Sequence, residues 1–111
     1  MIFEVRFTLR AAKQLKKLTK SEQKQIIDFI KNRIKKLDDP KKLGKALTGN
    51  LKKFWRYRAG DYRIICEIIE SSMLLVLVIA VGNRKFIYKK LRTTDNNTEK
   101  EAIKIIEEDL T

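Results

Sequence analysis

Histidine is absent from this 111-residue sequence, and cysteine occurs once, as Cys66. Without histidine there is no histidine-based nuclease or hydrolase and no zinc site with histidine ligands. One cysteine forms neither an internal disulfide nor a metal site built from several cysteines. Cys66 lies among isoleucines on an expected strand and has no imidazole to activate it, so we interpret it as a core residue rather than a nucleophile.

Glycine is also scarce, and long apolar runs are missing. The four glycines are scattered, so the sequence contains no glycine-rich loop for binding phosphates. No apolar run approaches the ~20 residues that a membrane-spanning helix needs. Residues 1–7 lack the basic-then-apolar layout of a signal peptide and are expected to form an edge strand. The expected location is therefore cytoplasmic.

Acidic residues are few in most of the chain, and their distribution is uneven. The formal net charge is +12, from 26 Lys and Arg against 14 Asp and Glu. Residues 1–92 hold 24 basic and 8 acidic residues, a balance of +16, whereas residues 93–111 hold 2 and 6, a balance of −4. A basic body with an acidic tail favours a polyanionic partner, most often nucleic acid. The alternative is a lysine-rich surface that is only solvated.

The order of apolar residues predicts one domain of the α+β class. Alternation predicts a strand over residues 2–7, and helical spacing predicts helices over residues 9–18 and about 21–37. Thr8 is expected to cap the first helix, and either Thr19 or Ser21 the second. Two helices joined by a few residues form an antiparallel hairpin, which must bury its apolar stripe on a sheet.

The remaining strands are expected to supply that sheet. Residues 54–58 and 62–69 read as two strands around a tight turn, and the apolar run over residues 73–81 reads as a buried central strand. The fold is thus an N-terminal strand and a helical hairpin on a small, mostly antiparallel, twisted sheet. A basic loop over residues 41–50 contains three lysines that either follow a phosphate chain or are merely solvated.

A second, smaller segment is expected after the domain of residues 1–92. Residues 93–98 are polar and turn-prone, which is typical of a linker. Glu99–Leu110 has an apolar stripe among acidic residues, which predicts an amphipathic C-terminal helix. Such a short helix needs an apolar surface to dock on. It either completes the core or covers the sheet until a helix of a partner protein displaces it.

Aromatic and arginine residues alternate in the strand over residues 54–58. Successive side chains point to opposite faces, so Trp55 and Tyr57 share one face while Phe54, Arg56 and Arg58 share the other. The first face is expected to pack on the core. The second presents planar guanidinium groups, which grip two phosphate oxygens at once.

Such a face offers a route to RNA cleavage without metal or histidine, because the ribose 2′-OH is itself a nucleophile. The protein then has to orient that hydroxyl and stabilise charge on the phosphoryl group. Arg56 and Arg63 lie on adjacent expected strands, and Arg84 follows the next one. A sheet brings all three to one concave face.

Two blocks of this sequence resemble the RelE/ParE toxin superfamily, small basic proteins of bacterial and archaeal toxin–antitoxin pairs. The first is Gly60-Asp61-Tyr62-Arg63, and the second is Val81-Gly82-Asn83-Arg84-Lys85 followed by Tyr88. The resemblance covers roughly residues 1–90 in length and element order. It implies a toxin that inhibits translation by ribosome-dependent cleavage of messenger RNA, acts without a cofactor, and is neutralised by a cognate antitoxin.

The resemblance also implies catalytic positions. Arg63, Arg84 and Tyr88 match an arginine, an arginine and a tyrosine of the superfamily's ribonucleases. Arg56 stands where the best-known member has a lysine, and Phe54 stands at another lysine of that site. Arginine is a poor general base because its pKa exceeds ~12. Either Lys52, Lys53 or a neighbour acts as the base, or catalysis depends on electrostatic stabilisation alone. The basic residues expected to contact RNA are Lys52, Lys53, Arg58, Lys85 and Lys89.

Three functions remain open at this level. The first is the metal-independent endoribonuclease just described. The second is the ParE-like branch of the superfamily, which poisons DNA gyrase by binding rather than by hydrolysis. The third is an RNA-binding protein without activity. For single residues, Tyr88 is either a site residue or an anchor of the last strand, and Glu67 is a candidate ion-pair partner of Arg63.

Overall fold

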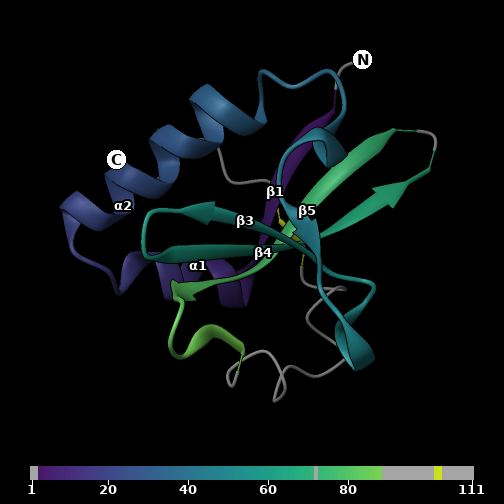
Figure 1. Ribbon diagram of the computed structural model, residues 1–111. Coiled ribbons are helices and arrows are strands. Elements are labelled where there is room, and N and C mark those ends of the chain that lie inside the picture. Colours follow the sequence, from purple (N-terminus) through teal and green to yellow (C-terminus); the bar gives the residue numbers. More distant parts are fainter. Residues whose placement is uncertain (1–2, 72, 89–101, 104–111) are drawn as a thin grey trace.

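The computed structural model of this chain describes residues 3–71, 73–88 and 102–103 (Figure 1). Its strands form one mixed sheet in the order β2–β3–β4–β5–β1–β6. The elements in chain order are β1 (Glu4–Thr8), α1 (Leu9–Lys16), α2 (Lys20–Phe29), a π-helical turn (Ile30–Ile34), β2 (Lys45–Ala46), β3 (Trp55–Ala59), β4 (Tyr62–Glu70), β5 (Leu74–Asn83) and β6 (Ala102–Ile103). The predicted α+β class is confirmed.

Both helices begin at threonine caps. The Thr8 hydroxyl accepts a hydrogen bond from the Ala11 amide at 3.1 Å, as predicted. Of the two caps considered for α2, Thr19 is the one used. Its hydroxyl accepts from the Glu22 amide at 3.1 Å, and the Glu22 carboxylate accepts from the Thr19 amide at 2.9 Å. This reciprocal capping box satisfies two backbone donors at the start of α2.

Antiparallel pairing joins β2, β3, β4 and β5, while β1 runs parallel to β5. Figure 1 shows β1 in purple beside the green β5. The prediction that the N-terminal strand lies at an edge is wrong, because β6 pairs with its other side at Phe7 and Thr8. β1 therefore lies between two strands along part of its length.

The structure describes only Ala102 and Ile103 of the C-terminal helix predicted over Glu99–Leu110. These two residues form β6, antiparallel to Thr8 and Phe7, so the helix prediction is wrong at this point. The outer edge of β1 has backbone N–H and C=O groups that an added strand satisfies. A short isolated helix is only marginally stable, so pairing with β1 is the better arrangement for these two residues. Residues 99–101 and 104–110 of that prediction, and the linker over residues 93–98, lie outside the described residues.

The sheet has a core on each face. On one face, α1 and α2 pack on the sheet, and the aromatic side chains Trp55 and Tyr57 lie in this core as predicted. The Trp55 indole donates to the Leu43 carbonyl at 2.8 Å, and the Tyr57 hydroxyl donates to the Pro40 carbonyl at 2.6 Å. Cys66 is fully buried there, as predicted, and burial raises the pKa of its thiol.

A smaller core lies on the other face of the sheet. It is built around Phe54, Ile65, Leu77 and Ile87, all buried. The β4–β5 register shifts by one residue between Ile65 and Cys66, which bulges β5 locally. The two helices α1 and α2 pack on the other face, with the larger core.

Candidate functional site

Three arginines gather on the face of the sheet opposite the helices. Arg56 and Arg58 alternate with the buried aromatics of β3, so they share this face. In the β3–β4 hairpin, Arg58 lies directly opposite Arg63, and Arg56 lies opposite Ile65. The register therefore places these three arginines on two neighbouring strands of one face. The sequence predicted that Arg56, Arg63 and Arg84 would meet there, and the convergence of Arg84 with the other two stays a prediction.

The chain after β5 folds back onto the same face. The Asn83 side-chain oxygen accepts from the Lys85 amide at 2.9 Å, and the Asn83 carbonyl accepts from the Phe86 amide at 3.1 Å. The Arg84 amide donates to the Asp61 carbonyl at 2.9 Å, which joins this turn to the β3–β4 turn. Arg84 itself is exposed. The two blocks that carry the superfamily resemblance are thus adjacent in space.

Gly82 leaves space for the chain after β5 to fold back onto the sheet. A Cβ atom at this position would lie 3.2 Å from Cδ1 of Ile87, closer than most side-chain contacts. Ile87 is fully buried in the smaller core, and this burial fixes where the next residue, Tyr88, begins. A side chain at this position would therefore require Ile87, the residue before Tyr88, to shift by a few tenths of an ångström.

Tyr88 and Arg56 are in direct contact. Nη1 of Arg56 donates to the hydroxyl oxygen of Tyr88 at 3.2 Å, although the two residues are 32 positions apart. Nε of Arg56 is buried and has no hydrogen-bond partner within the described residues. A guanidinium group carries five N–H donors, so Arg56 has donors beyond the one that contacts Tyr88, and the Tyr88 hydroxyl keeps its own proton to donate. Together they form a small donor cluster suited to an anion.

Arg63 has a different environment. Its exposed fraction is only 7%, and Nη1 donates to the carbonyls of Gly60 and Tyr62 at 2.9 and 3.1 Å. Gly60 has φ +63°, a left-handed conformation that favours glycine. Arg63 thus closes the β3–β4 turn, and the alternative in which it pairs with Glu67 is not formed.

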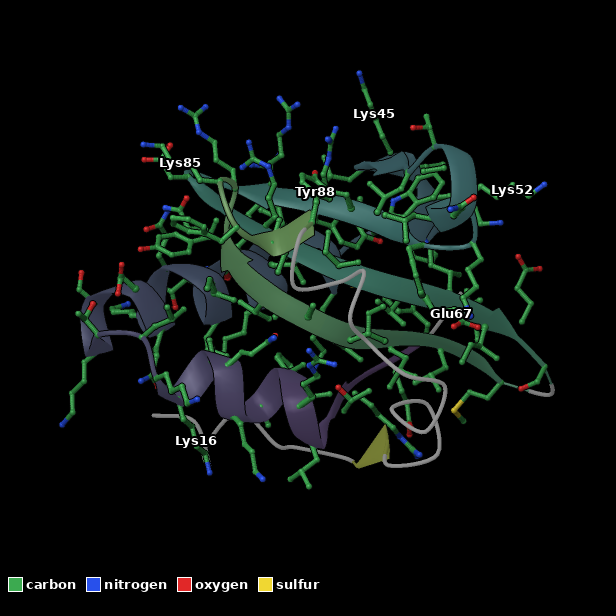
Figure 2. The ribbon with its side chains drawn as sticks, turned by 90° about the horizontal axis from the view of Figure 1, so that it is seen from below. Lys16, Lys45, Lys52, Glu67, Lys85 and Tyr88 are labelled. Carbon is green, nitrogen blue, oxygen red and sulfur yellow. The ribbon has the colours of Figure 1, made fainter. Side chains whose placement is uncertain are left out.

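The other predicted basic residues surround this cluster. Lys52 and Lys53 are exposed just before β3, and Nζ of Lys53 lies 5.0 Å from the Phe54 ring centroid. Lys85 is exposed in the turn after β5. In Figure 2, Lys85, Tyr88, Lys45 and Lys52 lie along one side of the molecule, whereas Lys16 lies on α1 at the opposite side. The predicted Lys89 lies outside the described residues.

Two basic residues beside the site were not predicted as site residues. Arg33, from the π-helical turn, and Lys45, from β2, line a surface pocket of about 250 Å³ together with Arg56 and Arg58. Lys45 belongs to the basic loop noted in the sequence. Arg33 follows Phe29 by four positions, a helical spacing that places the two side chains on one face. This spacing was the feature of the sequence that could have placed Arg33 beside Phe29.

The described residues contain no group of three or more Asp, Glu, Cys or His side chains that could hold a metal ion. They also include no helix that is both long and apolar enough to cross a membrane. The donors that the candidate site offers are guanidinium, ammonium and hydroxyl groups. Their chemistry is hydrogen bonding to an anion and stabilisation of negative charge.

A helical hairpin on one face of a small mixed sheet, with a cationic face and a tyrosine opposite, defines the class of small basic RelE/ParE-like α+β proteins. Residues 5–88 match the family model described as the ParE toxin of the type II toxin–antitoxin system parDE, and the chain belongs to this family. The predicted membership of the RelE/ParE superfamily is thereby confirmed. No curated protein sequence is similar enough to the chain to count as a match.

Solved structures are similar to this fold. The toxin–antitoxin complex RelBE2 from Mycobacterium tuberculosis includes a chain with 26% identity and a TM-score of 0.66, and the alignment covers 76% of this chain and 100% of that one. The conserved hypothetical protein HP0894 from Helicobacter pylori has 17% identity, coverage of 76% and 97%, and a TM-score of 0.55. The YoeB/ParE toxin from Agrobacterium tumefaciens has 18% identity, coverage of 74% and 99%, and a TM-score of 0.55. The last two show a shared fold.

Proposed function

We propose that this protein, a toxin of a toxin–antitoxin system by its family, inhibits translation by cleaving messenger RNA on the ribosome. The observation that carries the proposal is the contact between Arg56 and Tyr88 on the cationic face of the sheet opposite α1 and α2. A phosphate bound there would meet guanidinium and hydroxyl donors at once. The similarity to a chain of a toxin–antitoxin complex supports a cognate antitoxin as the physiological partner.

The proposed chemistry is attack of the ribose 2′-oxygen on the adjacent phosphorus, with departure of the 5′-oxygen. The proton of the 2′-OH passes to a base, the leaving 5′-oxygen takes a proton from water, and the products are a 2′,3′-cyclic phosphate and a 5′-hydroxyl. Arg56 and Arg84 stabilise the charge on the phosphoryl oxygens, and Tyr88 orients the nucleotide. Lys52 and Lys53, just before β3, are the candidates for the base. Arg63 supports this arrangement by holding the turn on which Asp61 receives Arg84.

Translating ribosomes programmed with a defined message provide the test. The wild-type protein is expected to cut the message, and Arg56→Ala is expected to lower the rate by roughly 10²–10³, the effect of losing one charge-stabilising donor. Tyr88→Phe removes only a hydroxyl, so it isolates the contact with Arg56. Lys16→Ala, on the opposite side of the molecule, is the matched control and should cut at the wild-type rate (Figure 2). A wild-type protein that leaves the message intact would contradict the proposal.

A second candidate is inhibition of DNA gyrase by binding. Two observations favour it: the matching family model is described as a ParE toxin, and Phe54 is buried at a position where a lysine of the ribonuclease site is expected. A supercoiling assay with purified gyrase, run beside the ribosome assay, separates the two. The third candidate, an RNA-binding protein without activity, would bind RNA and affect neither assay.

A further inference from the structure

The pocket beside β3 lies at an edge of the sheet that is only partly covered. β2 pairs with Trp55 and Arg56 alone, so the rest of β3, as far as Ala59, has no strand on its outer side within the described residues. The pocket of about 250 Å³ opens beside this edge. Its lining comes from the end of α2, the π-helical turn, the loop before β2, and β3: Phe29, Arg33, Leu43, Gly44, Lys45, Arg56 and Arg58.

The charges around this pocket are all of one sign. Four of its seven lining residues are cationic, and none is acidic. None of the ion pairs formed within the described part of the chain involves Arg33, Lys45, Arg56 or Arg58. Four cations without ion-pair partners among the described residues focus a positive potential on the concave surface that they surround. An anion is the ligand that this arrangement favours.

The pocket also has an apolar wall. Phe29 and Leu43 are partly buried, and the Arg33 guanidinium lies 5.6 Å from the Phe29 ring centroid. A planar cation over an aromatic ring stays accessible while its position is restricted. Gly44 has φ +83°, and a Cβ there would collide with the Arg56 carbonyl, so glycine lets the loop approach β3 closely. Cations and an apolar wall together suit a nucleotide better than a bare phosphate.

Arg56 connects this pocket to the candidate site. It lines the pocket, and its Nη1 contacts the Tyr88 hydroxyl on the open face. The volume is below the roughly 300–1,000 Å³ of pockets that enclose drug-sized ligands, so it fits one nucleotide unit rather than a larger ligand. We propose that this pocket is a nucleotide subsite that binds the RNA next to the unit held at Arg56 and Tyr88. Arg33, Lys45 and Arg58 contact its phosphate, and Phe29 and Leu43 contact its sugar or base.

This subsite rests on the proposed function, since it takes the same RNA strand around the edge of the sheet. The test uses a fluorescent single-stranded RNA with 2′-O-methyl groups, which binds but is not cut, and the full-length protein. The double variant Arg33→Gln/Lys45→Gln removes two contacts and lies outside the proposed catalytic residues. The matched control Lys16→Gln/Lys20→Gln removes the same charge from exposed positions of the helical layer.

The expected result is a weaker affinity and a salt-dependence slope that is smaller by up to about 0.7, the value for one phosphate contact on a single strand. The control should keep the wild-type slope. On ribosomes, the double variant should raise the concentration needed for half-maximal cleavage while the rate at saturation stays at the wild-type value. A role confined to folding would change the thermal midpoint instead, so each variant is also melted.

The outcomes separate the subsite from the function. Wild-type cleavage with equal RNA affinity for both double variants would overturn the subsite and leave the nuclease intact. Absence of wild-type cleavage would end the nuclease proposal, while the slope comparison would still decide whether the pocket binds RNA. A wild-type protein that does not bind the RNA would overturn the subsite too. If the double variant loses antitoxin affinity and keeps RNA affinity, the pocket is a protein-binding site and the proposal fails.

Discussion

Arg63 and Arg84 differ sharply in their surroundings, although both match arginines of the superfamily's ribonucleases. Arg63 is buried, and its guanidinium is bonded to two carbonyls of the β3–β4 turn. Arg84 is exposed, and its hydrogen bond to Asp61 comes from the backbone amide, which any side chain preserves. Removal of the two side chains therefore tests different properties of the molecule.

Arg63→Ala is expected to lower the free energy of unfolding by about 1.5–3 kcal/mol, the range for hydrogen bonds of a charged donor. Arg84→Ala should change it by less than about 0.5 kcal/mol, as for other exposed positions, while lowering cleavage. Urea unfolding of both variants measures the difference. Equal stability losses for the two would show that Arg63 does not hold the turn.

Two buried groups on the helix-side core titrate only at high pH. Burial raises the pKa of the Cys66 thiol and of the Tyr57 hydroxyl above their usual values of 9.0 and 10.0. Because the unfolded chain loses these protons first, the stability that the neutral groups contribute is complete below about pH 9 and declines as pH rises further. The sign follows from the unfolded state binding fewer protons than the folded state.

The free energy of unfolding is accordingly expected to fall above pH 9 by up to about 1.4 kcal/mol per pH unit for each group. Cys66→Ala should remove the thiol's part of this slope between about pH 9 and about pH 10. Urea unfolding at a series of pH values measures both proteins. Identical slopes for wild type and variant would mean that the thiol is accessible in the folded protein.

At the scale of elements, the position of Tyr88 depends on how the end of β5 packs. Gly82 leaves the space that Ile87 occupies, since a Cβ there would lie 3.2 Å from Cδ1 of Ile87. The end of β5 thus positions Tyr88 through the packing of Ile87 rather than through a direct bond to Tyr88. Loss of that space should therefore affect the Arg56–Tyr88 contact more than the fold.

Gly82→Ala is expected to reduce toxicity in growing cells, because the new Cβ displaces Ile87 and with it Tyr88. Ile87→Val removes Cδ1, the atom that the new Cβ would meet at 3.2 Å, and itself costs about 0.5–1.5 kcal/mol of stability. The double variant should regain toxicity relative to Gly82→Ala alone. If Gly82→Ala is as toxic as the wild type, the packing argument for this glycine is wrong.

At the scale of the whole molecule, charge dominates. The net charge is +12, and Lys45, Lys52 and Lys85 lie on the side of the molecule away from Lys16 (Figure 2). Binding to a phosphate chain releases counterions, so electrostatic affinity depends steeply on salt. A protein that recognised its target by apolar contacts alone would not show this dependence.

RNA affinity is expected to fall steeply between about 50 and 200 mM salt, with the slope set by the number of phosphates contacted. Fluorescence anisotropy with the 2′-O-methyl RNA measures it, and Lys16→Gln should leave the slope unchanged. A flat affinity over this range would contradict the view that the basic face binds a polyanion, whichever enzyme activity the protein has.

Local sequence determined α1, α2 and the strands β1, β3, β4 and β5 of this protein. The spacing of apolar residues fixes the two helices, threonine oxygens fix their starts, and alternation places Trp55 and Tyr57 on one face with Arg56 and Arg58 on the other. These features depend on neighbours a few residues apart, so they are readable without the fold. The capping box of Thr19 and Glu22 also joins residues three positions apart, although Ser21 was an equally good candidate for the cap in the sequence.

Only the tertiary structure decided how those elements share their contacts. The place of β1 between β5 and β6, the contact of Arg56 with Tyr88, the bonds of Arg63 to turn carbonyls, and the meeting of Arg33 with Lys45 at one pocket all join distant segments. Sequence alternation gives the face of a side chain but not its reach or its partner. Hydrogen bonds and burial across the sheet select among those partners, and they are set by the packing of the whole chain.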